Sequence, residues 1–305
     1  METSELETMM LVRRSSLASV IECMRPGQWV KNGFVLAPLV FSEKLLDPRS
    51  EWKELGAVCA FCLSASAVYL WNDILDRRSD LMHPSKRNRP IPSGRLSVPS
   101  AAVACLVLLA AGLILGFGTN PATGVLLCVY MGINVLYGAG LKHVVVMDLM
   151  CISLGFVLRV LAGATAIQAQ PSHWLLMCTF LLAMTLSIFR RRQEAVTLGK
   201  GSADHRRVLG DYSIAWFDQA GTMLSAATIV AYALYTVSPE TQARLGTDRL
   251  FYTLPFVVFG TLRYLYLVYS GDRTGNPSSA LMADKPLLGC VVAWLAACAL
   301  VIYTR

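Results

Sequence analysis

The chain has 305 residues, of which 55% are hydrophobic and only 15% are charged. Soluble domains carry about 25% charged residues, so this composition excludes a protein whose whole surface faces water. Basic residues outnumber acidic ones by 27 to 20. We therefore predict an all-α, polytopic membrane protein in which the placement of the basic residues sets the orientation.

Nine apolar segments are predicted to cross the bilayer, whose hydrocarbon core, about 30 Å thick, requires about 20 helical residues. In chain order they are 30–46, 54–74, 98–118, 121–138, 145–168, 172–189, 213–237, 249–269 and 286–303. Polar residues and Pro38 interrupt the first segment, whereas the other eight are long and apolar. We divide the chain into an N-terminal segment, 1–28, and a single transmembrane domain, 29–305.

The basic residues fall mainly on one side of these spans. Nineteen Lys and Arg lie on the side of the N-terminus, six lie on the opposite side, and Arg159 and Arg263 lie within spans. The basic side includes the loops near 75–97, 139–144, 190–212 and 270–285. Because short loops rich in Lys and Arg stay in the cytoplasm, we expect this side to face the cytoplasm from the inner (plasma) membrane.

The strongest local signal closes the second predicted span, which ends in Asn72-Asp73-Ile-Leu-Asp76-Arg-Arg-Ser-Asp80. On a continuous helix, Asp73, Asp76 and Asp80 would share one face. Carboxylates gathered at a membrane edge are costly unless a cation compensates them, and Mg²⁺ binds one or two carboxylates together with substrate phosphates. We expect a magnesium site here; the alternative is a solvated helix end that the two intervening arginines neutralise.

A basic segment follows directly, His83-Pro-Ser-Lys86-Arg87-Asn-Arg89-Pro90. Its prolines oppose helix formation, and its Lys and Arg side chains suit a diphosphate that also carries a metal ion. Lys86, Arg87 and Arg89 are therefore candidate ligands of substrate phosphates. The alternative is an ordinary basic loop that binds anionic headgroups of membrane lipids.

Further polar residues lie on or near the same side. They are Lys31 and Asn32 in the first span, Tyr137, Lys142 and His143 between the fourth and fifth spans, and Arg191 and Glu194 at the end of the sixth. Arg159 lies inside the fifth span, and we expect Asp148 or a bound anion as its partner. Nucleic acid is not expected as a partner, because the basic residues follow the membrane topology.

These motifs together resemble the UbiA superfamily of intramembrane prenyltransferases, over residues from about 20 to 303. Three of them resemble one branch, the decaprenyl-phosphate phosphoribosyltransferases: Arg25-Pro-Gly-Gln28-Trp29-Val-Lys31-Asn32, His83-Pro-Ser-Lys86-Arg87-Asn-Arg89-Pro90 and Tyr137-Gly-Ala-Gly-Leu141-Lys142-His143. The usual second aspartate-rich motif after the sixth span is replaced by Arg190-Arg-Arg-Gln-Glu194. This departure disfavours a prenyl diphosphate donor, although the branch usually begins this stretch with Lys rather than Arg190.

The resemblance implies a nine-helix UbiA-like bundle with a cytoplasm-facing active site. The implied reaction transfers a 5-phosphoribosyl group from 5-phosphoribosyl 1-diphosphate to a polyprenyl phosphate, for synthesis of a cell-envelope glycan precursor. Mg²⁺ would be held by Asp73, Asp76 and Asp80. The other expected site residues are Lys31, Asn32, Asn72, Lys86, Arg87, Arg89, Tyr137, Lys142, His143, Arg159, Arg191 and Glu194.

Within this set, Asp73, Asp76, Lys86 and Tyr137 are the expected catalytic residues, and the others bind substrate. Two alternatives remain: a UbiA-type enzyme that moves a prenyl group to an aromatic or other acceptor, and a lipid-phosphate transporter. The concentration of charge at one face and the lack of an internal repeat disfavour the transporter. Whether copies of the chain form a homo-oligomer stays open.

Overall fold

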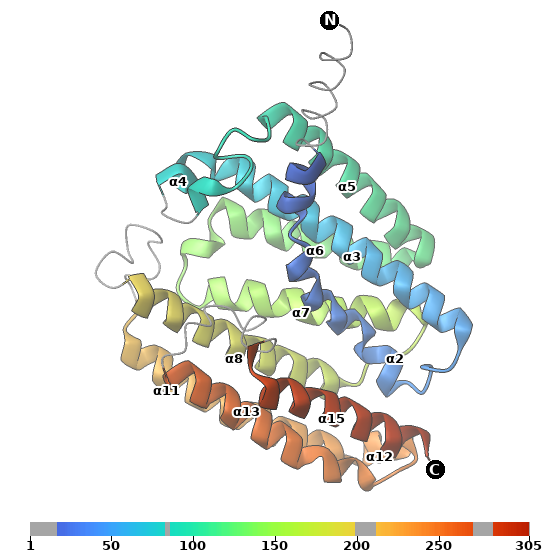
Figure 1. The fold of residues 1–305 in the computed structure, drawn as a ribbon. Coiled ribbons are helices and arrows are strands. Elements are labelled where there is room, and N and C mark those ends of the chain that lie inside the picture. Colours follow the sequence, from blue (N-terminus) through green and yellow to red (C-terminus); the bar gives the residue numbers. More distant parts are fainter. Residues whose placement is uncertain (1–16, 83–85, 199–211, 271–282, 305) are drawn as a thin grey trace, which may run out of the picture.

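The computed structural model describes residues 17–82, 86–198, 212–270 and 283–304, and within these ranges all regular structure is helical (Figure 1). Eight stretches are long and apolar enough to cross a membrane, which confirms the prediction of a polytopic helical protein. They are α3 (Pro48–Leu75), α5 (Val98–Thr119), α6 (Pro121–Ala139), α7 (Met147–Ala166), α8 (His173–Leu198), α11 (Ile214–Val237), η5 (Arg249–Thr253) with α13 (Leu254–Tyr269), and α15 (Lys285–Tyr303). Shorter elements are η1 (Pro26–Leu36), α2 (Ala37–Phe41), α4 (Arg77–Met82), η2 (Lys86–Asn88), η3 (Leu141–His143) and α12 (Pro239–Leu245).

Local sequence explains where the long helices begin. Five of them start after a side chain that accepts a hydrogen bond from a backbone amide of the first turn: Asp47, Ser97, Asn120, Ser213 and Asp284. Four of these five also have proline in the first turn, where the missing amide hydrogen costs nothing. These signals set helix starts close to the predicted span boundaries.

The first predicted span, 30–46, is not a continuous α-helix. Its place is taken by the 3₁₀-helix η1 and the five-residue helix α2. The amide of Ala37 donates to the carbonyl of Phe34, and Pro38 has no amide hydrogen to close an α-helical bond to that oxygen. The segment is therefore apolar enough to be buried, but Pro38 prevents it from forming one regular α-helix.

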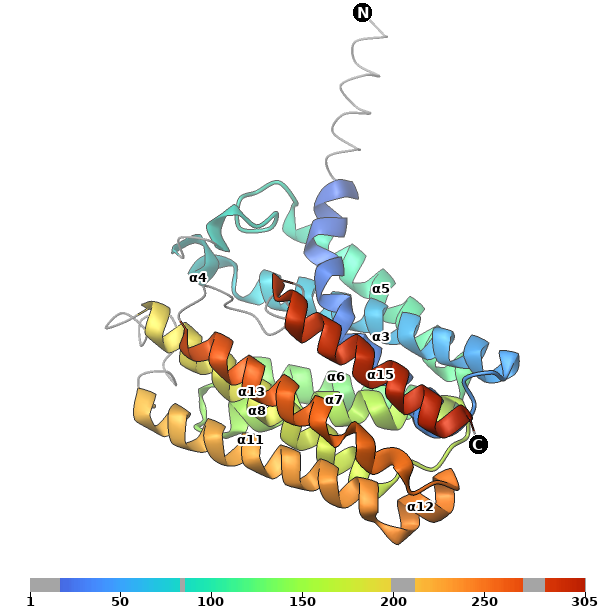
Figure 2. The same ribbon diagram turned by 60° about the horizontal axis from the view of Figure 1, so that its bottom comes forward.

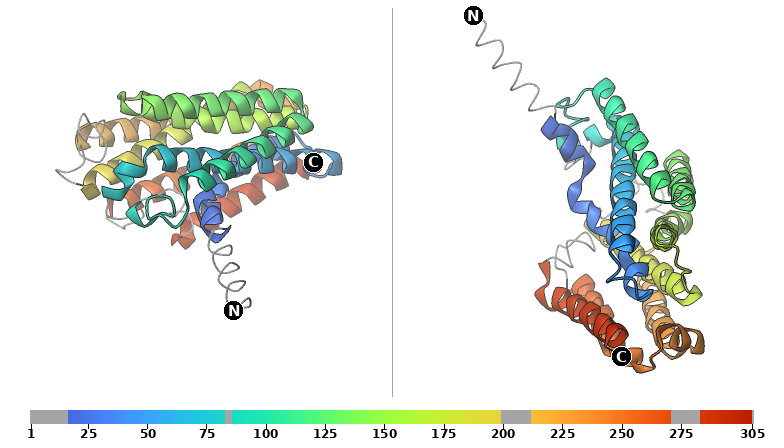
Figure 3. Two further views of the ribbon diagram at one scale, coloured as in Figure 1. Left: turned by 90° about the horizontal axis from the view of Figure 1, so that it is seen from above. Right: turned by 90° about the vertical axis from the view of Figure 1, so that its right-hand side faces the viewer.

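The axes of the long helices are roughly aligned, as the view from above shows (Figure 3). Neighbours in sequence pack together from α5 to α8, α11 packs on α8 and α13, and α13 packs on α15. The segment η1–α2 lies against α3 and α7, and Phe41 of α2 contacts Tyr235 and Trp294 with ring centroids 6.1 and 6.2 Å apart. The segment η1–α2 thus lies between the α3–α5 side and the α11–α15 side of the bundle (Figure 2).

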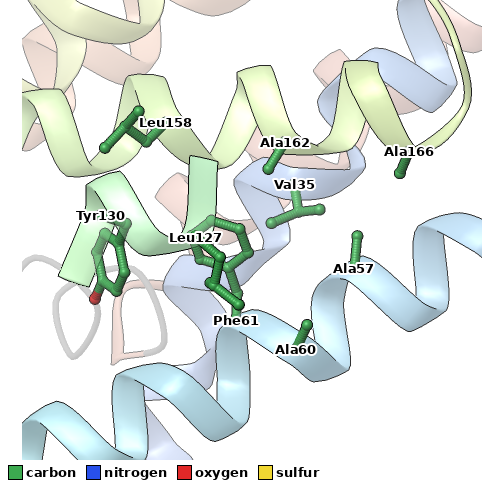
Figure 4. Close-up of a cluster of buried hydrophobic side chains, with 9 residues drawn as sticks. All are labelled: Val35, Ala57, Ala60, Phe61, Leu127, Tyr130, Leu158, Ala162 and Ala166. Carbon is green, nitrogen blue, oxygen red and sulfur yellow. The ribbon is translucent and has the colours of Figure 1, made fainter. Parts of the chain in front are cut away.

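The core around η1 depends on small residues. Figure 4 shows Val35 of η1 among side chains of α3, α6 and α7, including Ala57, Ala60, Ala162 and Ala166. Gly163 is required here, because a Cβ atom at this position would lie 2.0 Å from the carbonyl oxygen of Val35. This close approach places the polar residues of η1 directly against α7 and α3.

Candidate active site

Three groups of polar side chains lie around η1 and near one end of the bundle. At this end α3, α6 and α8 end and α7 begins (Figure 1). The aspartate cluster consists of Arg25, Asp73, Asp80, Lys86 and Arg89. The arginine cluster consists of Tyr137, Asp148, Arg191, Glu194 and Tyr212. A third group, Asn32, Tyr130 and Arg159, is buried within the bundle.

The aspartate cluster joins the end of α3 to α4 and to the basic segment. Asp73 and Asp80 are both buried, and one nitrogen of Arg89, Nη1, lies 3.0 Å from Asp73 Oδ1 and 2.8 Å from Asp80 Oδ2. Arg25 donates a further hydrogen bond to Asp73. Lys86 Nζ lies 3.8 Å from Asp80 Oδ1. The basic segment therefore folds back on the carboxylates that precede it.

Asp76 does not join the other two carboxylates. Helix α3 ends at Leu75, and Asp76 adopts non-helical backbone angles before α4 begins. Its carboxylate is 44% exposed and lies 3.3 Å from Lys142 Nζ in η3. Among the described residues, no three acidic, His or Cys side chains form a metal-binding group. The continuous helical face expected for Asp73, Asp76 and Asp80 is thus interrupted at the helix end.

The residues present nevertheless fit Mg²⁺. Arg89 Nη1 places a positive charge within 3.0 Å of a carboxylate oxygen of Asp73 and one of Asp80, and a metal ion held by these residues would supply the same compensating charge. Mg²⁺ in proteins takes one or two carboxylates and completes its shell with water and substrate phosphates. Asp73 and Asp80 have the donor chemistry for this, provided that the Arg89 guanidinium moves toward the substrate.

The arginine cluster fixes a buried guanidinium on α8. Arg191 is 4% exposed; its Nε lies 2.9 Å from Asp148 Oδ2, its Nη1 2.6 Å from Glu194, and its Nη2 3.0 Å from the Tyr137 hydroxyl. The Tyr212 hydroxyl donates to Asp148 Oδ1 at 3.1 Å. Burial raises the pKa of Tyr212 to about 12, so this hydroxyl stays protonated.

Arg159 has neutral partners instead of the expected Asp148. Its guanidinium donates to Asn32 Oδ1 (2.8 Å), the Gly155 carbonyl (2.8 Å) and the Tyr130 hydroxyl (3.2 Å). Eleven residues of α7 separate it from Asp148, a rise of about 16 Å that exceeds the reach of an arginine side chain. Within the described residues no acidic side chain pairs with Arg159. Its guanidinium instead lies over the rings of Phe61, Tyr130 and Phe156, with ring centroids 5.6, 4.8 and 5.4 Å away.

The end of α6 connects the two charged clusters. Tyr137 bonds to Arg191, and the next residue, Gly138, lies beside Asn72, whose Oδ1 would be 3.6 Å from a Cβ atom there. Lys31 of η1 lies near enough to Arg25, Arg159 and Arg190 for their charges to act on it.

The remaining candidates lie at the edge of this region. Arg87 and His143 are exposed, in η2 and η3 respectively. The rest of the predicted set contributes to one of the contacts above. His83 lies outside the described residues.

Sequence reasoning left four residues out of the predicted site: Arg25, Tyr69, Asp148 and Tyr212. Arg25 stacks on Tyr69, 4.9 Å from its ring centroid, and contacts Asp73. Arg25 also has a left-handed backbone angle, φ 53°, which is uncommon outside glycine. The signal for Arg25 was present in the motif that contains Lys31 and Asn32, whereas nothing local in the sequence marks Tyr69 or Tyr212.

A helical membrane bundle that brings buried carboxylates and cations together at one end has the form of an intramembrane enzyme. The model of the UbiA prenyltransferase family matches residues 35–284, so the chain belongs to that family and is a transferase. It is 31% identical over 289 residues to a decaprenyl-phosphate phosphoribosyltransferase of Corynebacterium glutamicum, covering 93% of this chain and 86% of that protein. It is 29% identical over 300 residues to the protein of the same name from Mycolicibacterium smegmatis, covering 95% and 94%.

Solved structures agree with the fold. A UbiA homologue from Archaeoglobus fulgidus, bound to GPP and Mg²⁺, superposes with a TM-score of 0.71 at 20% identity and covers 93% of this chain and 99% of the other. The same homologue bound to DMAPP and Mg²⁺ gives a TM-score of 0.69. The expected UbiA-like helical bundle is therefore confirmed, whereas the predicted number of nine crossings is not: among the described residues, eight helices are long and apolar enough to cross a membrane.

Proposed function

We propose that this protein transfers the 5-phosphoribosyl group from 5-phosphoribosyl 1-diphosphate to a polyprenyl phosphate and releases diphosphate. An oxygen of the lipid phosphate forms a bond to the anomeric carbon of the sugar. The bond from that carbon to the diphosphate breaks, and diphosphate leaves with the electron pair. The attacking oxygen is already anionic near neutral pH, so the reaction needs no strong general base.

The arginine cluster carries this proposal. The usual UbiA pattern has a second aspartate-rich motif after the sixth span, whereas here the end of α8 has a single acidic residue, Glu194, beside the buried Arg191, which has three hydrogen-bonding partners. A fixed guanidinium suits a phosphate group, which it contacts in a fork. The site thus combines carboxylates for one phosphorylated substrate with cations for a second, as the names of the two bacterial relatives imply.

Each cluster has its own part in this scheme. Asp73 and Asp80, with Asp76 nearby, would hold Mg²⁺ on the diphosphate, where the ion neutralises charge on the leaving group. Asn72, Lys86 and Arg89 bind oxygens of the same substrate. The remaining cations are assigned to the lipid phosphate and the 5-phosphate: Lys31, Lys142, Arg159 and Arg191. We assign Tyr137, whose hydroxyl accepts a hydrogen bond from Arg191, to the region of the anomeric carbon.

We propose further that η1 and α2 form a ninth crossing and that the site faces the cytoplasm from the inner membrane. Eleven residues of 3₁₀-helix and five of α-helix rise about 30 Å together, enough for the hydrocarbon core. Nine crossings place the C-terminus outside the cytoplasm. Alkaline phosphatase fused after Arg305 should then be active, and the same reporter fused after Leu198 inactive; the reverse pattern would overturn the orientation.

The function is tested with membranes that contain the protein, labelled 5-phosphoribosyl 1-diphosphate, a polyprenyl phosphate and Mg²⁺. We expect labelled lipid from the wild type and none from Asp73→Asn or Arg191→Met. Asp284→Asn is the matched control, because it removes the carboxylate that pairs with Arg263, outside all three site clusters. It should retain activity.

The two alternatives give different results in the same membranes. A UbiA-type prenyltransferase would yield no labelled lipid but would join a prenyl diphosphate to an aromatic acceptor. A transporter would move polyprenyl phosphate between leaflets without forming a covalent product. Either outcome would overturn the proposal.

A further inference from the structure

The Tyr212 hydroxyl occupies a junction between two parts of the proposed site. It accepts a hydrogen bond from the Val146 amide at 2.5 Å and donates one to Asp148 Oδ1 at 3.1 Å. Its ring is buried against Trp216 and Phe217, whose ring centroids are 4.7 and 4.8 Å away. The hydroxyl is therefore held in place by a rigid aromatic group at the start of α11.

The first of these parts is Asp148, the carboxylate that binds Arg191. Asp148 is fully buried, and its two oxygens are shared between Tyr212 and Arg191. Arg191 in turn uses all three guanidinium nitrogens on Asp148, Glu194 and Tyr137. If the Tyr212 hydroxyl is removed, Asp148 loses one of the two side-chain hydrogen bonds that it accepts from described residues, and its hold on the Arg191 guanidinium weakens.

The second part is the turn before α7. Val146 has φ 69° and ψ −38°, angles that a β-branched residue rarely adopts. Its amide hydrogen bond to Tyr212 opposes relaxation of this turn. Four residues earlier in the same connection is Lys142, which contacts Asp76. One hydroxyl thus constrains both the arginine cluster and the connection that carries Lys142.

We propose that Tyr212 is a positioning residue for phosphoribosyl transfer, which orients Arg191 through Asp148 and holds the turn that carries Lys142. The expected effect on kcat/KM rests on the proposed function, whereas the expected effect on the Arg191 side chain does not. Tyr212 does not touch the reacting groups itself. Its effect should therefore depend on Arg191 and on the conformation of Val146.

The chain provides a matched comparison one residue further along α8. Arg192 donates to Asp218, and the Tyr269 hydroxyl donates to the same carboxylate oxygen at 3.0 Å. This second Tyr–Asp–Arg arrangement is more exposed, with Asp218 at 34%, and none of its members belongs to the three groups of the site. Tyr269→Phe therefore removes the same chemical group from the same kind of contact, away from the site.

The kinetic test compares Tyr212→Phe with Tyr269→Phe in the transfer assay. Because a lost hydrogen bond to a charged group is involved, we expect kcat/KM to fall about tenfold or more for Tyr212→Phe and less than about twofold for Tyr269→Phe. In an Arg191→Lys background, Tyr212→Phe should add less than about twofold, since coupled residues are not additive. Equal losses in the two Tyr→Phe variants, or full additivity with Arg191→Lys, would overturn the proposal.

A second readout does not require the proposed activity. Phenylglyoxal labels arginine side chains, and mass spectrometry of detergent-solubilised protein gives the labelling rate at Arg191 separately from that at its neighbours. We expect Arg191 to react several times faster in Tyr212→Phe than in the wild type, and at the wild-type rate in Tyr269→Phe. An unchanged rate in Tyr212→Phe would refute the positioning role even if the wild type transferred no phosphoribosyl group.

The turn is tested by rescue. Glycine adopts the backbone angles of Val146 without strain. Val146→Gly combined with Tyr212→Phe should therefore recover part of the lost kcat/KM, whereas Val146→Gly alone should change it by less than about twofold. A double variant no better than Tyr212→Phe would remove the turn from the proposal. Elution as a single symmetric peak in detergent confirms that each variant is folded.

Discussion

Replacement of Arg89 by methionine tests how much the positive charge of Arg89 stabilises the two buried carboxylates of the aspartate cluster. The variant keeps the length and apolar part of the side chain but removes the nitrogen that lies 3.0 Å from Asp73 and 2.8 Å from Asp80. Arg25 remains on Asp73, and Lys86 remains 3.8 Å from Asp80. Two buried carboxylates then face each other with weaker compensation.

The cost follows from the geometry. The two oxygens are at most about 6 Å apart, where two unit charges repel by about 3 kcal/mol at an effective dielectric constant of about 20. A destabilisation of this size should lower the thermal midpoint in detergent by several degrees. Mg²⁺ can restore the missing charge, so the midpoint of Arg89→Met should rise with millimolar Mg²⁺ by more than that of the wild type.

The assay is thermal unfolding of purified protein with and without Mg²⁺, which needs no substrate. Lys86→Met is the control, because Lys86 Nζ lies 3.8 Å from Asp80, farther than Arg89 Nη1; its midpoint should fall less. If Arg89→Met were as stable as the wild type, or if Mg²⁺ raised both midpoints equally, Asp73 and Asp80 would not form the charge-sensitive pair that we infer.

Three further predictions concern the core and the buried arginine. Gly163→Ala should cost about 1–3 kcal/mol of stability, because its Cβ would lie 2.0 Å from the Val35 oxygen; an unchanged thermal midpoint would contradict the close contact. Glu54→Gln should leave the midpoint nearly unchanged, because both Glu54 oxygens are buried without a hydrogen-bond partner among the described residues, and an unpaired buried carboxyl is expected to be neutral; a large fall would show that Glu54 is ionised. Arg159→Lys should reduce phosphoribosyl transfer at least about tenfold, since lysine cannot reproduce the three hydrogen bonds of the guanidinium, and wild-type transfer rates would exclude Arg159 from the site.

Helix positions were predictable because their signals are local. Apolar length placed eight spans close to their observed bounds, and the run of motifs predicted the UbiA fold. The predicted span 30–46 is not a regular helix, because composition does not report which amide hydrogens are available to close each turn.

The site was predicted by composition more than by geometry. Asp73, Asp80, Lys86 and Arg89 lie together in the aspartate cluster, whereas Arg191 lies in the separate arginine cluster. The sequence could not show that α3 stops before Asp76. The sequence also did not show which charged residues pair. Asp148 pairs with Arg191, 43 residues away, instead of with Arg159 on the same helix. Contacts of this kind depend on how helices pack, which no single segment encodes.

The Asp148–Arg191 pair also affects how the chain enters the membrane. Helix α7 is synthesised before α8, so a carboxylate near its start reaches the bilayer before the guanidinium that neutralises it. A charged side chain is costly there until its partner arrives. Helices α7 and α8 are therefore expected to leave the insertion machinery as a pair, and a chain truncated between them should be retained or degraded, whereas one truncated after Leu198 should be stably inserted.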